Sequence, residues 1–294
     1  MEFPEYLEMA KRQLAIDFNC APGDFDRTEN VLTVSAANPG RRMYSKEKYF
    51  LQMATFGGNA VLSADEALHP FLRGFMADKT GHWLFEQEKL AVLERELNKY
   101  GYRLCRTHHM CLPKIDVTFQ SNIPIKWFSG REQIEPFYDG RFYNALCERY
   151  HEERPDRIAV CAYDGDEIMG MAGCSEDAPG FLQIGIDIFP QYRGRGVGTY
   201  LSLLMKNEII RRDGMPVYGT AAANIHSQNI AMNCGFRPAW VELEAEKISK
   251  DADATDNKEN KEATAPKFGE TTWVDDMKQE LEDYIEEQGI YIRQ

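Results

Sequence analysis

Residues 193–198, RGRGVG, combine three glycines with two arginines where an apolar run gives way to a helical pattern. A glycine-rich turn from strand to helix leaves amide N–H groups unpaired, and the helix dipole adds partial positive charge there. The glycines remove side chains that would block close approach, and the arginines add positive charge. No Ser, Thr, Asp or Asn stands at the expected cap. The segment therefore predicts an anion site, with phosphate as the expected anion.

Two familiar phosphate loops do not match this segment. It lacks the G-x-x-x-x-G-K-[ST] pattern of nucleoside-triphosphate loops. It also lacks G-x-G-x-x-G, and no clear βαβ unit opens a parallel sheet around it. A glycine-rich turn that binds nothing stays an alternative for three glycines taken alone.

The elements around the loop follow a regular order. Strands are expected at 157–164, 168–174, 181–189, 216–222 and 238–244, and helices at 197–212 and 224–235. The first two strands form a hairpin around Gly165. Segment 131–153 carries two short helical patterns around Gly140. Antiparallel strands followed by β-α-β-α-β predict an α/β fold of the α+β type, with one mixed sheet and helices packed on it.

The first 115 residues or so predict a smaller mixed α/β region. Helices are expected at 4–18, 64–77 and 82–100, and strands at 48–56, 59–65 and 102–112. Gly57 and Gly58 mark a hairpin turn between two of these strands. This region is expected either to wall off a substrate pocket or to serve as a structural cap without a ligand.

Segment 188–198, IFPQYRGRGVG, resembles the coenzyme A-binding segment of the GNAT superfamily of acyl-CoA-dependent N-acyltransferases. That family's loop is R/Q-x-x-G-x-G/A, which Arg193, Gly196 and Gly198 match. Ile188, two residues before the proline, falls where the family has an apolar residue. NIHSQNIAMNCGF (224–236) is similar to the family's Asn, helix and Gly-Phe segment.

The resemblance implies that the loop amides hold the pyrophosphate of acetyl-CoA. The strand before the loop is expected to bulge and to splay from its neighbour, so that free backbone around Ile188 pairs with the pantetheine amides. The acyl group would lie in that gap, where an amine attacks the thioester directly. The residues expected to contact the cosubstrate are Ile186, Ile188, Phe189, Arg193, Gly194, Arg195, Gly196, Val197, Gly198, Thr199, Asn224, Ser227 and Asn229.

An attacking amine must be neutral, so a general base or a chain of waters must take its proton. Asp187 is the first candidate, because it lies in an apolar strand next to the expected acyl site. A structural hydrogen bond is the alternative, since a carboxylate in a strand core is costly unless paired. Glu242 and Glu244 are weaker candidates, because we expect solvated glutamates on an edge strand.

The tyrosine that often protonates the leaving thiolate in this family falls at Ala231, so its hydroxyl is absent here. Tyr218 and Ser227 are the nearest replacements by sequence, and we expect Tyr218 to be the acid. Departure of the thiolate without an acid stays open. Asn224 is expected to cap the following helix and also to face the cofactor.

Composition narrows the class of protein. The formal net charge is −13, which argues against a general nucleic-acid binder. Seven cysteines, an odd number, predict reduced and mostly buried thiols. CRTHHMC (105–111) offers Cys and His residues to a metal, but its strand-like alternation sends neighbours to opposite faces, so no metal is expected. No apolar run is long enough to span a bilayer and no signal peptide is recognised, so a cytoplasmic location is expected.

These features predict an N-acetyltransferase that moves the acetyl group of acetyl-CoA to a primary amine of a small molecule or peptide. Three parts are expected: an N-terminal mixed domain (1–120), a GNAT-like domain (121–245), and an acidic linker with a C-terminal helix (246–294). A non-catalytic acyl-CoA sensor is the main alternative, and an interaction protein that docks a partner through its acidic tail is a weaker one. No membrane partner is expected, and a homodimer stays open.

Overall fold

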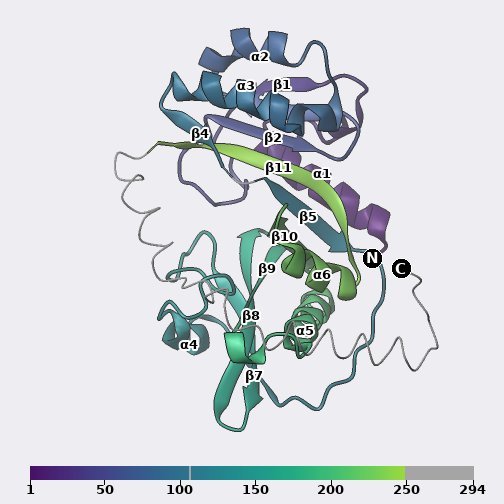
Figure 1. Cartoon of the computed structure of the whole chain (residues 1–294), viewed down its shortest axis with the longest axis vertical. Coiled ribbons are helices and arrows are strands. Elements are labelled where there is room, and N and C mark those ends of the chain that lie inside the picture. Colours follow the sequence, from purple (N-terminus) through teal and green to yellow (C-terminus); the bar gives the residue numbers. More distant parts are fainter. Residues whose placement is uncertain (106, 249–294) are drawn as a thin grey trace, which may run out of the picture. The chain divides into compact units, whose positions relative to one another are not determined.

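The computed structural model describes residues 1–105 and 107–248 (Figure 1). Residues Met1–Lys247 form one compact unit. The tail helix predicted around Trp273 to Ile285 lies outside the described residues. No described helix has the length and apolar character needed to cross a membrane.

The described strands join in one mixed sheet. The mixed sheet predicted for the second half is present, and it also includes the strands of the first half. Its order is β1-β3-β2-β11-β5-β10-β9-β8-β7-β6, with β4 paired to β11 off this path. β1 pairs with β3, and β9 with β10, in parallel, and the other pairs are antiparallel. The strands are β1 (Val31–Val34), β2 (Leu51–Thr55), β3 (Ala60–Ala64), β4 (Tyr102–Leu104), β5 (His108–Pro113), β6 (Ile125–Ser129), β7 (Asp156–Asp164), β8 (Glu167–Ala178), β9 (Phe181–Ile188), β10 (Met215–Ala221) and β11 (Phe236–Lys247).

Helices cover both faces of this sheet. The α-helices are α1 (Phe3–Asp17), α2 (His69–Phe75), α3 (Gln87–Asn98), α4 (Arg131–Ile134), α5 (Val197–Arg211) and α6 (Ile225–Asn233). Single 3₁₀ turns are η1 (Pro22–Asp26), η2 (Glu66–Leu68), η3 (Gly81–Phe85), η4 (Glu135–Phe137) and η5 (Pro190–Tyr192).

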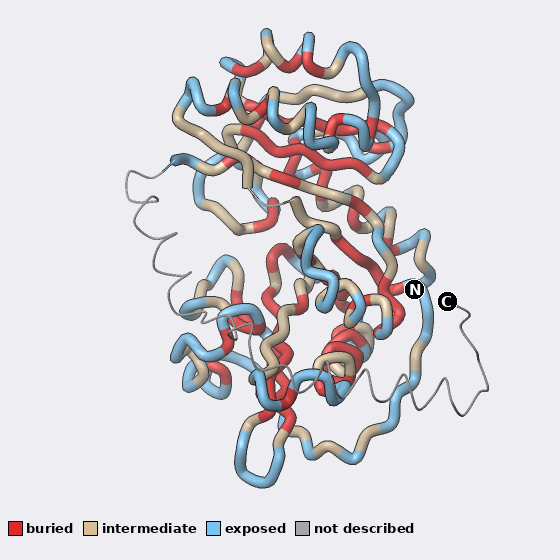
Figure 2. Tube along the Cα trace, viewed as in Figure 1, coloured by how far each residue is buried: buried red, intermediate tan, exposed pale blue. Residues whose placement is uncertain are grey.

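Separate apolar cores lie under these helices, where Figure 2 shows the strands largely buried. α5 packs Leu201 and Met205 onto β7–β10. α1 packs Leu14 against strands of both halves of the sheet, while α2 and α3 cover β2 and β3 on the opposite face. The α1 core contains Val61, Val217 and Trp240, so it joins residues from both ends of the sequence.

The local elements largely follow the sequence patterns. The hairpin around Gly57 joins β2 and β3, and the one around Gly165 joins β7 and β8; both glycines have positive φ. Two expectations are wrong. Segment 102–112 forms two strands, β4 and β5, instead of one. The second helical pattern after Gly140 forms turns and bends, because this stretch packs flat on the sheet, as described below.

β5 joins the two halves of the sheet. It lies before residue 120 in sequence, yet it pairs antiparallel with β10 on one side and with β11 on the other. β11 in turn pairs with β2 beyond β5. The sheet therefore runs without interruption through both halves of the described chain, and the division at residue 120 stays a prediction.

Candidate active site

A notch opens between β9 and β10. The two strands pair in parallel from Met215 with Phe181 to Tyr218 with Ile184, and there the register ends. Beyond that point β9 continues beside β8 to Ile188, while β10 continues beside β5 to Ala221. The predicted splay is therefore present. The predicted bulge is not in β9: the β8–β9 register shifts between Glu176 and Ala178, on β8.

Backbone groups of β9 face this notch. Phe189 donates its amide to Met169 O on the β8 side, 3.0 Å away. Hydrogen-bonding directions alternate along a strand, so the backbone groups of Ile186 and Ile188 are directed away from β8. Within the described chain, Ile188 O accepts a hydrogen bond from Arg193 Nε at 3.0 Å. The notch thus offers strand backbone to an amide-bearing ligand.

The glycine-rich loop lies at one end of the notch. Gly194 and Gly196 have φ of 75° and 74°, a backbone conformation that favours glycine. Gly196 is the N-cap of α5 and provides no side-chain cap. None of the described residues accepts a hydrogen bond from the amides of 194–199. These donors remain available to an anion, as the sequence predicted.

Most of the predicted cofactor residues line one cavity of about 1270 Å³. These are Ile186, Ile188, Arg193, Gly194, Gly196, Val197, Gly198, Thr199, Asn224, Ser227 and Asn229. Two predicted residues are not in its lining. Phe189 packs its ring 5.6 Å from that of Phe142, and the Arg195 guanidinium lies 5.5 Å from the Tyr192 ring.

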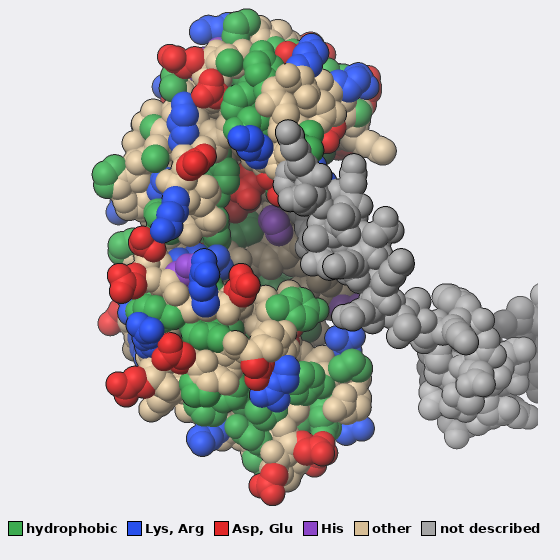
Figure 3. All heavy atoms as spheres, turned by 90° about the vertical axis from the view of Figure 1, so that its left-hand side faces the viewer, with side chains coloured by type: hydrophobic (Ala, Val, Ile, Leu, Met, Phe, Trp, Pro, Cys, Tyr) green, Lys and Arg blue, Asp and Glu red, His purple; other side chains and the backbone are tan. Residues whose placement is uncertain are grey.

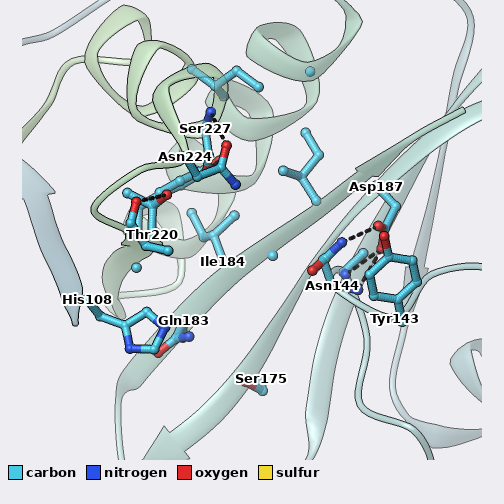
Figure 4. Close-up of a pocket in the computed structure, with 18 of the residues that line it drawn as sticks. His108, Tyr143, Asn144, Ser175, Gln183, Ile184, Asp187, Thr220, Asn224 and Ser227 are labelled. Atoms are coloured by element: carbon cyan, nitrogen blue, oxygen red, sulfur yellow. Dashed lines mark hydrogen bonds between the residues drawn. The ribbon is translucent and has the colours of Figure 1, made fainter. Parts of the chain in front are cut away.

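α6 begins beside the notch. Asn224 caps it by accepting a hydrogen bond from the Ser227 amide at 3.1 Å, as expected (Figure 4). Ala231 follows Ser227 by four residues, so both lie on one face of the helix. Ala231 is fully buried in the core that also contains Tyr218.

Tyr218 rises from β10 toward this face of α6. Its hydroxyl lies 3.1 Å from Ser227 Oγ. The residue is 1% exposed, and burial raises the pKa of its phenol to about 12. The phenol therefore stays protonated at neutral pH and can act as a hydrogen-bond or proton donor, in the cavity that also contains the notch.

Asp187 faces the other side of β9. Its Oδ2 accepts the amides of Asn144 and Ala145 at 2.8 Å each, and its Oδ1 accepts Asn144 Nδ2 at 2.6 Å (Figure 4). A Cβ added to Gly185 would lie 1.8 Å from Asn144 O, so this segment rests directly on β9. Asp187 therefore makes the structural hydrogen bonds that the sequence analysis gave as the alternative to catalysis. Its role as the catalytic base stays a prediction.

The cavity continues from the notch along the opposite face of the sheet, where Figure 3 shows a hollow with acidic and histidine side chains. Its lining there includes Ser175, Gln183, His108 and Gln52 from four strands, and Phe18, Arg42 and Tyr44 from the first 50 residues. Tyr44 forms hydrogen bonds at 2.6 Å with Asp177 Oδ2 and with Gln183 Oε1. The N-terminal region therefore contributes a wall of the cavity.

Glu242 and Glu244 correct the sequence analysis. They lie on β11, which is interior to the sheet, so the expectation of an edge strand with solvated glutamates is wrong. Burial opposes the ionisation of Glu242, but Arg42 outweighs it and holds its pKa below the usual value. Burial and the neighbouring Glu242 raise the pKa of Glu244 to about 7. Both glutamates line the cavity.

No motif marked the cavity residues outside the notch. Arg42, Tyr44, Gln52 and His108 stand in segments that lack a chemical signature, and only the pairing of distant strands brings them together. The one available signal was a pair of glutamates two residues apart, which places both on one face of a strand.

Cys111 and His108, from the cysteine and histidine segment, lie on different faces of β5. Cys111 is buried in the α5 core while His108 lines the cavity, so the alternation of β5 separates them. In residues 1–105 and 107–248, no group of three or more His, Cys, Asp or Glu residues could hold a metal ion. All seven cysteines are free thiols, four of them buried.

Solved structures similar to this chain include a GNAT-family protein from Novosphingobium aromaticivorans. It is 18% identical with a TM-score of 0.40, over 51% of this chain and 69% of that chain. A GCN5-related N-acetyltransferase-like protein from Streptococcus suis is 14% identical with a TM-score of 0.43, over 67% and 83%. A Salmonella typhimurium protein described as an acetyltransferase, solved with its cofactor acetyl-CoA, is 14% identical with a TM-score of 0.31, over 45% and 97%.

No curated protein matches the chain. The sequence profile of the Acetyltransferase (GNAT) family matches residues 121–236, which span β6 to the start of β11 and contain the notch, the glycine-rich loop and α6. Residues 121–236 of this chain therefore match the Acetyltransferase (GNAT) family, and the residues before 121 lie outside that match.

Proposed function

We propose that this protein transfers the acetyl group of acetyl-CoA to a primary amine of a small molecule or peptide. The observation that carries the proposal is the notch between β9 and β10, with the unpaired amides of 194–199 at its end. A diphosphate fits the loop amides and the dipole of α5. Pantetheine amides fit the backbone groups of Ile186 and the amide of Ile188, which are directed into the notch, whereas the Ile188 carbonyl already accepts a hydrogen bond from Arg193. The thioester would then lie in the cavity beside Tyr218.

In the proposed reaction a neutral amine nitrogen attacks the thioester carbonyl carbon. The new C–N bond forms, the C–S bond breaks, and a general base or a chain of waters takes the proton from the nitrogen. Tyr218 donates its phenolic proton to the leaving sulfur and recovers one through Ser227, whose hydroxyl is within 3.1 Å. The family tyrosine is missing at Ala231, and Tyr218 fills the neighbouring space from β10.

The cavity supports a bound acceptor as well as a bound donor. It extends well past the notch, to Phe18, which follows α1, and to residues of β2, β5 and β11. A sensor that only binds acyl-CoA does not need this second compartment. The extension therefore favours the enzyme over the non-catalytic alternative.

Thiol release tests the proposal. The full-length protein is mixed with acetyl-CoA and a panel of primary amines, and free coenzyme A is measured over time. We expect release above the hydrolysis background for at least one amine, with a mass increase of one acetyl group on that amine. Tight binding of coenzyme A with no release from any amine would favour the sensor, and absence of binding would refute both.

A further inference from the structure

The arginines in the acceptor part of the cavity already have carboxylate partners. Arg42 is 4% exposed; its Nε donates to Asp17 Oδ2 at 2.5 Å, and its Nη1 and Nη2 donate to both oxygens of Glu242 at 2.9 Å. Arg154 Nε donates to Asp177 Oδ1 at 2.8 Å. Two carboxylates therefore neutralise Arg42, and Asp177 neutralises Arg154. Neither arginine is available to bind a further anion.

Two carboxylates that line the same cavity have no cationic partner among the described residues. Glu244 and Asp156 form no salt bridge with any described Lys, Arg or His. Asp156 is 2% exposed, and its Oδ1 accepts no hydrogen bond. Burial raises the pKa of Asp156. A carboxylate held away from water without a counter-ion is costly, and a cationic ligand would remove that cost.

Glu244 is the one of the two nearer to the N-terminal wall. Its register partner on β2 is Gln52, which also lines the cavity. The titratable and charged groups around it are Glu242 and Glu246 on its own strand, Arg42 and Tyr49 from the loop before β2, and His108 on β5 opposite Glu242. Arg42 is already shared by Asp17 and Glu242, so it does not balance Glu244.

The distance from the notch decides what Glu244 can reach. β11 is separated from β10 by β5 alone, and Glu242 aligns through His108 with Ala221 at the end of β10. Two strand spacings place β11 about 10 Å from β10. Glu244 also lies two residues beyond the level of Ala221 along the strand direction, and Tyr218 lies three residues before Ala221, so the path from Tyr218 to Glu244 is longer than this spacing. This is too far for direct contact with the attacking nitrogen, but it suits a second group on the same acceptor.

We propose that Glu244 binds the distal cationic group of the acceptor, and that the acceptor is a linear diamine or polyamine whose two nitrogens lie more than about 10 Å apart. The near amine attacks in the notch while the far ammonium is held by the Glu244 carboxylate beside Gln52. This inference rests on the proposed acetyl transfer for its chemistry, but the binding of the cation can be measured without it.

The test compares linear α,ω-diamines of increasing length with the monoamines of the same chain length. We expect KM for the best diamine to be at least about tenfold below that of its monoamine, as a charge-assisted contact allows. In Glu244→Gln this advantage should disappear, so that KM for the diamine rises to that of its monoamine. Glu246→Gln is the matched control, because it stands on the same strand, pairs with Arg103 and lies outside the cavity lining.

The preference for the diamine over the monoamine should increase with pH. Glu244 carries its charge only above its raised pKa of about 7, so the diamine advantage should grow from pH 6 to pH 8. Protonation of the attacking amine affects diamine and monoamine alike and cancels in their ratio. In Glu244→Gln the ratio should not change with pH.

Calorimetric titration of the protein with diamine and monoamine separates this inference from the proposed function. Tighter binding of the diamine, lost in Glu244→Gln, supports the subsite even if no amine releases thiol. Equal affinities in the wild-type protein overturn the subsite even if acetyl transfer is observed. A diamine preference that survives in Glu244→Gln overturns the assignment to Glu244.

Discussion

At the scale of single residues, Tyr218 of β10 lies in the same buried core as Ala231, the position where the GNAT family often has a tyrosine. Ala231 removes a hydroxyl from α6, and the Tyr218 ring fills the adjoining space from β10. The link between them is Ser227, one helical turn before Ala231 and 3.1 Å from the Tyr218 hydroxyl. Nearness along the chain was enough to nominate Tyr218 and Ser227, but only the structure brings the two hydroxyls together.

Tyr218→Phe removes the proposed acid and keeps the ring. We expect kcat for acetyl transfer to fall by about 10²-fold, because a positioned general acid contributes at this level. The KM for acetyl-CoA should stay within about threefold, since the phenol acts on the leaving sulfur. Steady-state thiol release measures both constants.

Tyr163→Phe is the control for that experiment, because Tyr163 lies on β7 outside the cavity lining. Its kcat should equal the wild-type value. An unchanged kcat in Tyr218→Phe would mean that the thiolate departs without this acid.

At the scale of elements, local patterns were sufficient for the donor half of the site. Glycine spacing, an uncapped helix start and strand periodicity predicted the loop and α5, because each depends on residues close together in sequence. The splay of β9 from β10 was expected from the family resemblance alone. The acceptor half depends on β5 lying between β10 and β11 and on β2 extending the sheet. Such pairings join residues about 100 or more positions apart, and periodicity within a strand does not specify its neighbours.

Gly198→Ala tests the donor half. A Cβ at this position would lie 3.1 Å from Ile230 Cδ1, 3.5 Å from Ile188 Cγ1 and 3.6 Å from Ile186 Cδ1, on the wall of the notch. It narrows the path expected for pantetheine while leaving the helix intact. We expect the Kd for coenzyme A, measured by calorimetry, to rise about tenfold, or about 1.4 kcal/mol.

Gly74→Ala is the matched control, because this glycine also lies in a helix and a Cβ there meets nothing within 4 Å. Its Kd for coenzyme A should equal that of the wild-type protein. A wild-type Kd in Gly198→Ala would place the pantetheine path outside the notch.

At the scale of the whole described molecule, the sheet joins residues 121–236, which match the GNAT family, to the residues before them. β5 supplies Met110, Cys111 and Leu112, all at most 2% exposed, to the cores on both faces of the sheet. α1 covers Trp240 and Val217 on one of those faces. The same N-terminal residues wall the cavity through Arg42 and Tyr44. The cores of the sheet and the wall of the cavity therefore both depend on residues before 120.

A fragment of residues 121–248 tests this dependence and the predicted division at residue 120. The fragment lacks β5, so no strand lies between β10 and β11. It also lacks α1, so the core side chains around Trp240 lose the residues of β5 and α1 that pack against them. Each large buried side chain lost costs about 2–5 kcal/mol, against a total stability of about 5–15 kcal/mol. We therefore expect the fragment to show no cooperative thermal transition by circular dichroism.

Residues 1–248 should melt cooperatively and bind coenzyme A like the full chain. A fragment that melts cooperatively and binds coenzyme A with full affinity would establish residues 121–245 as an independent domain.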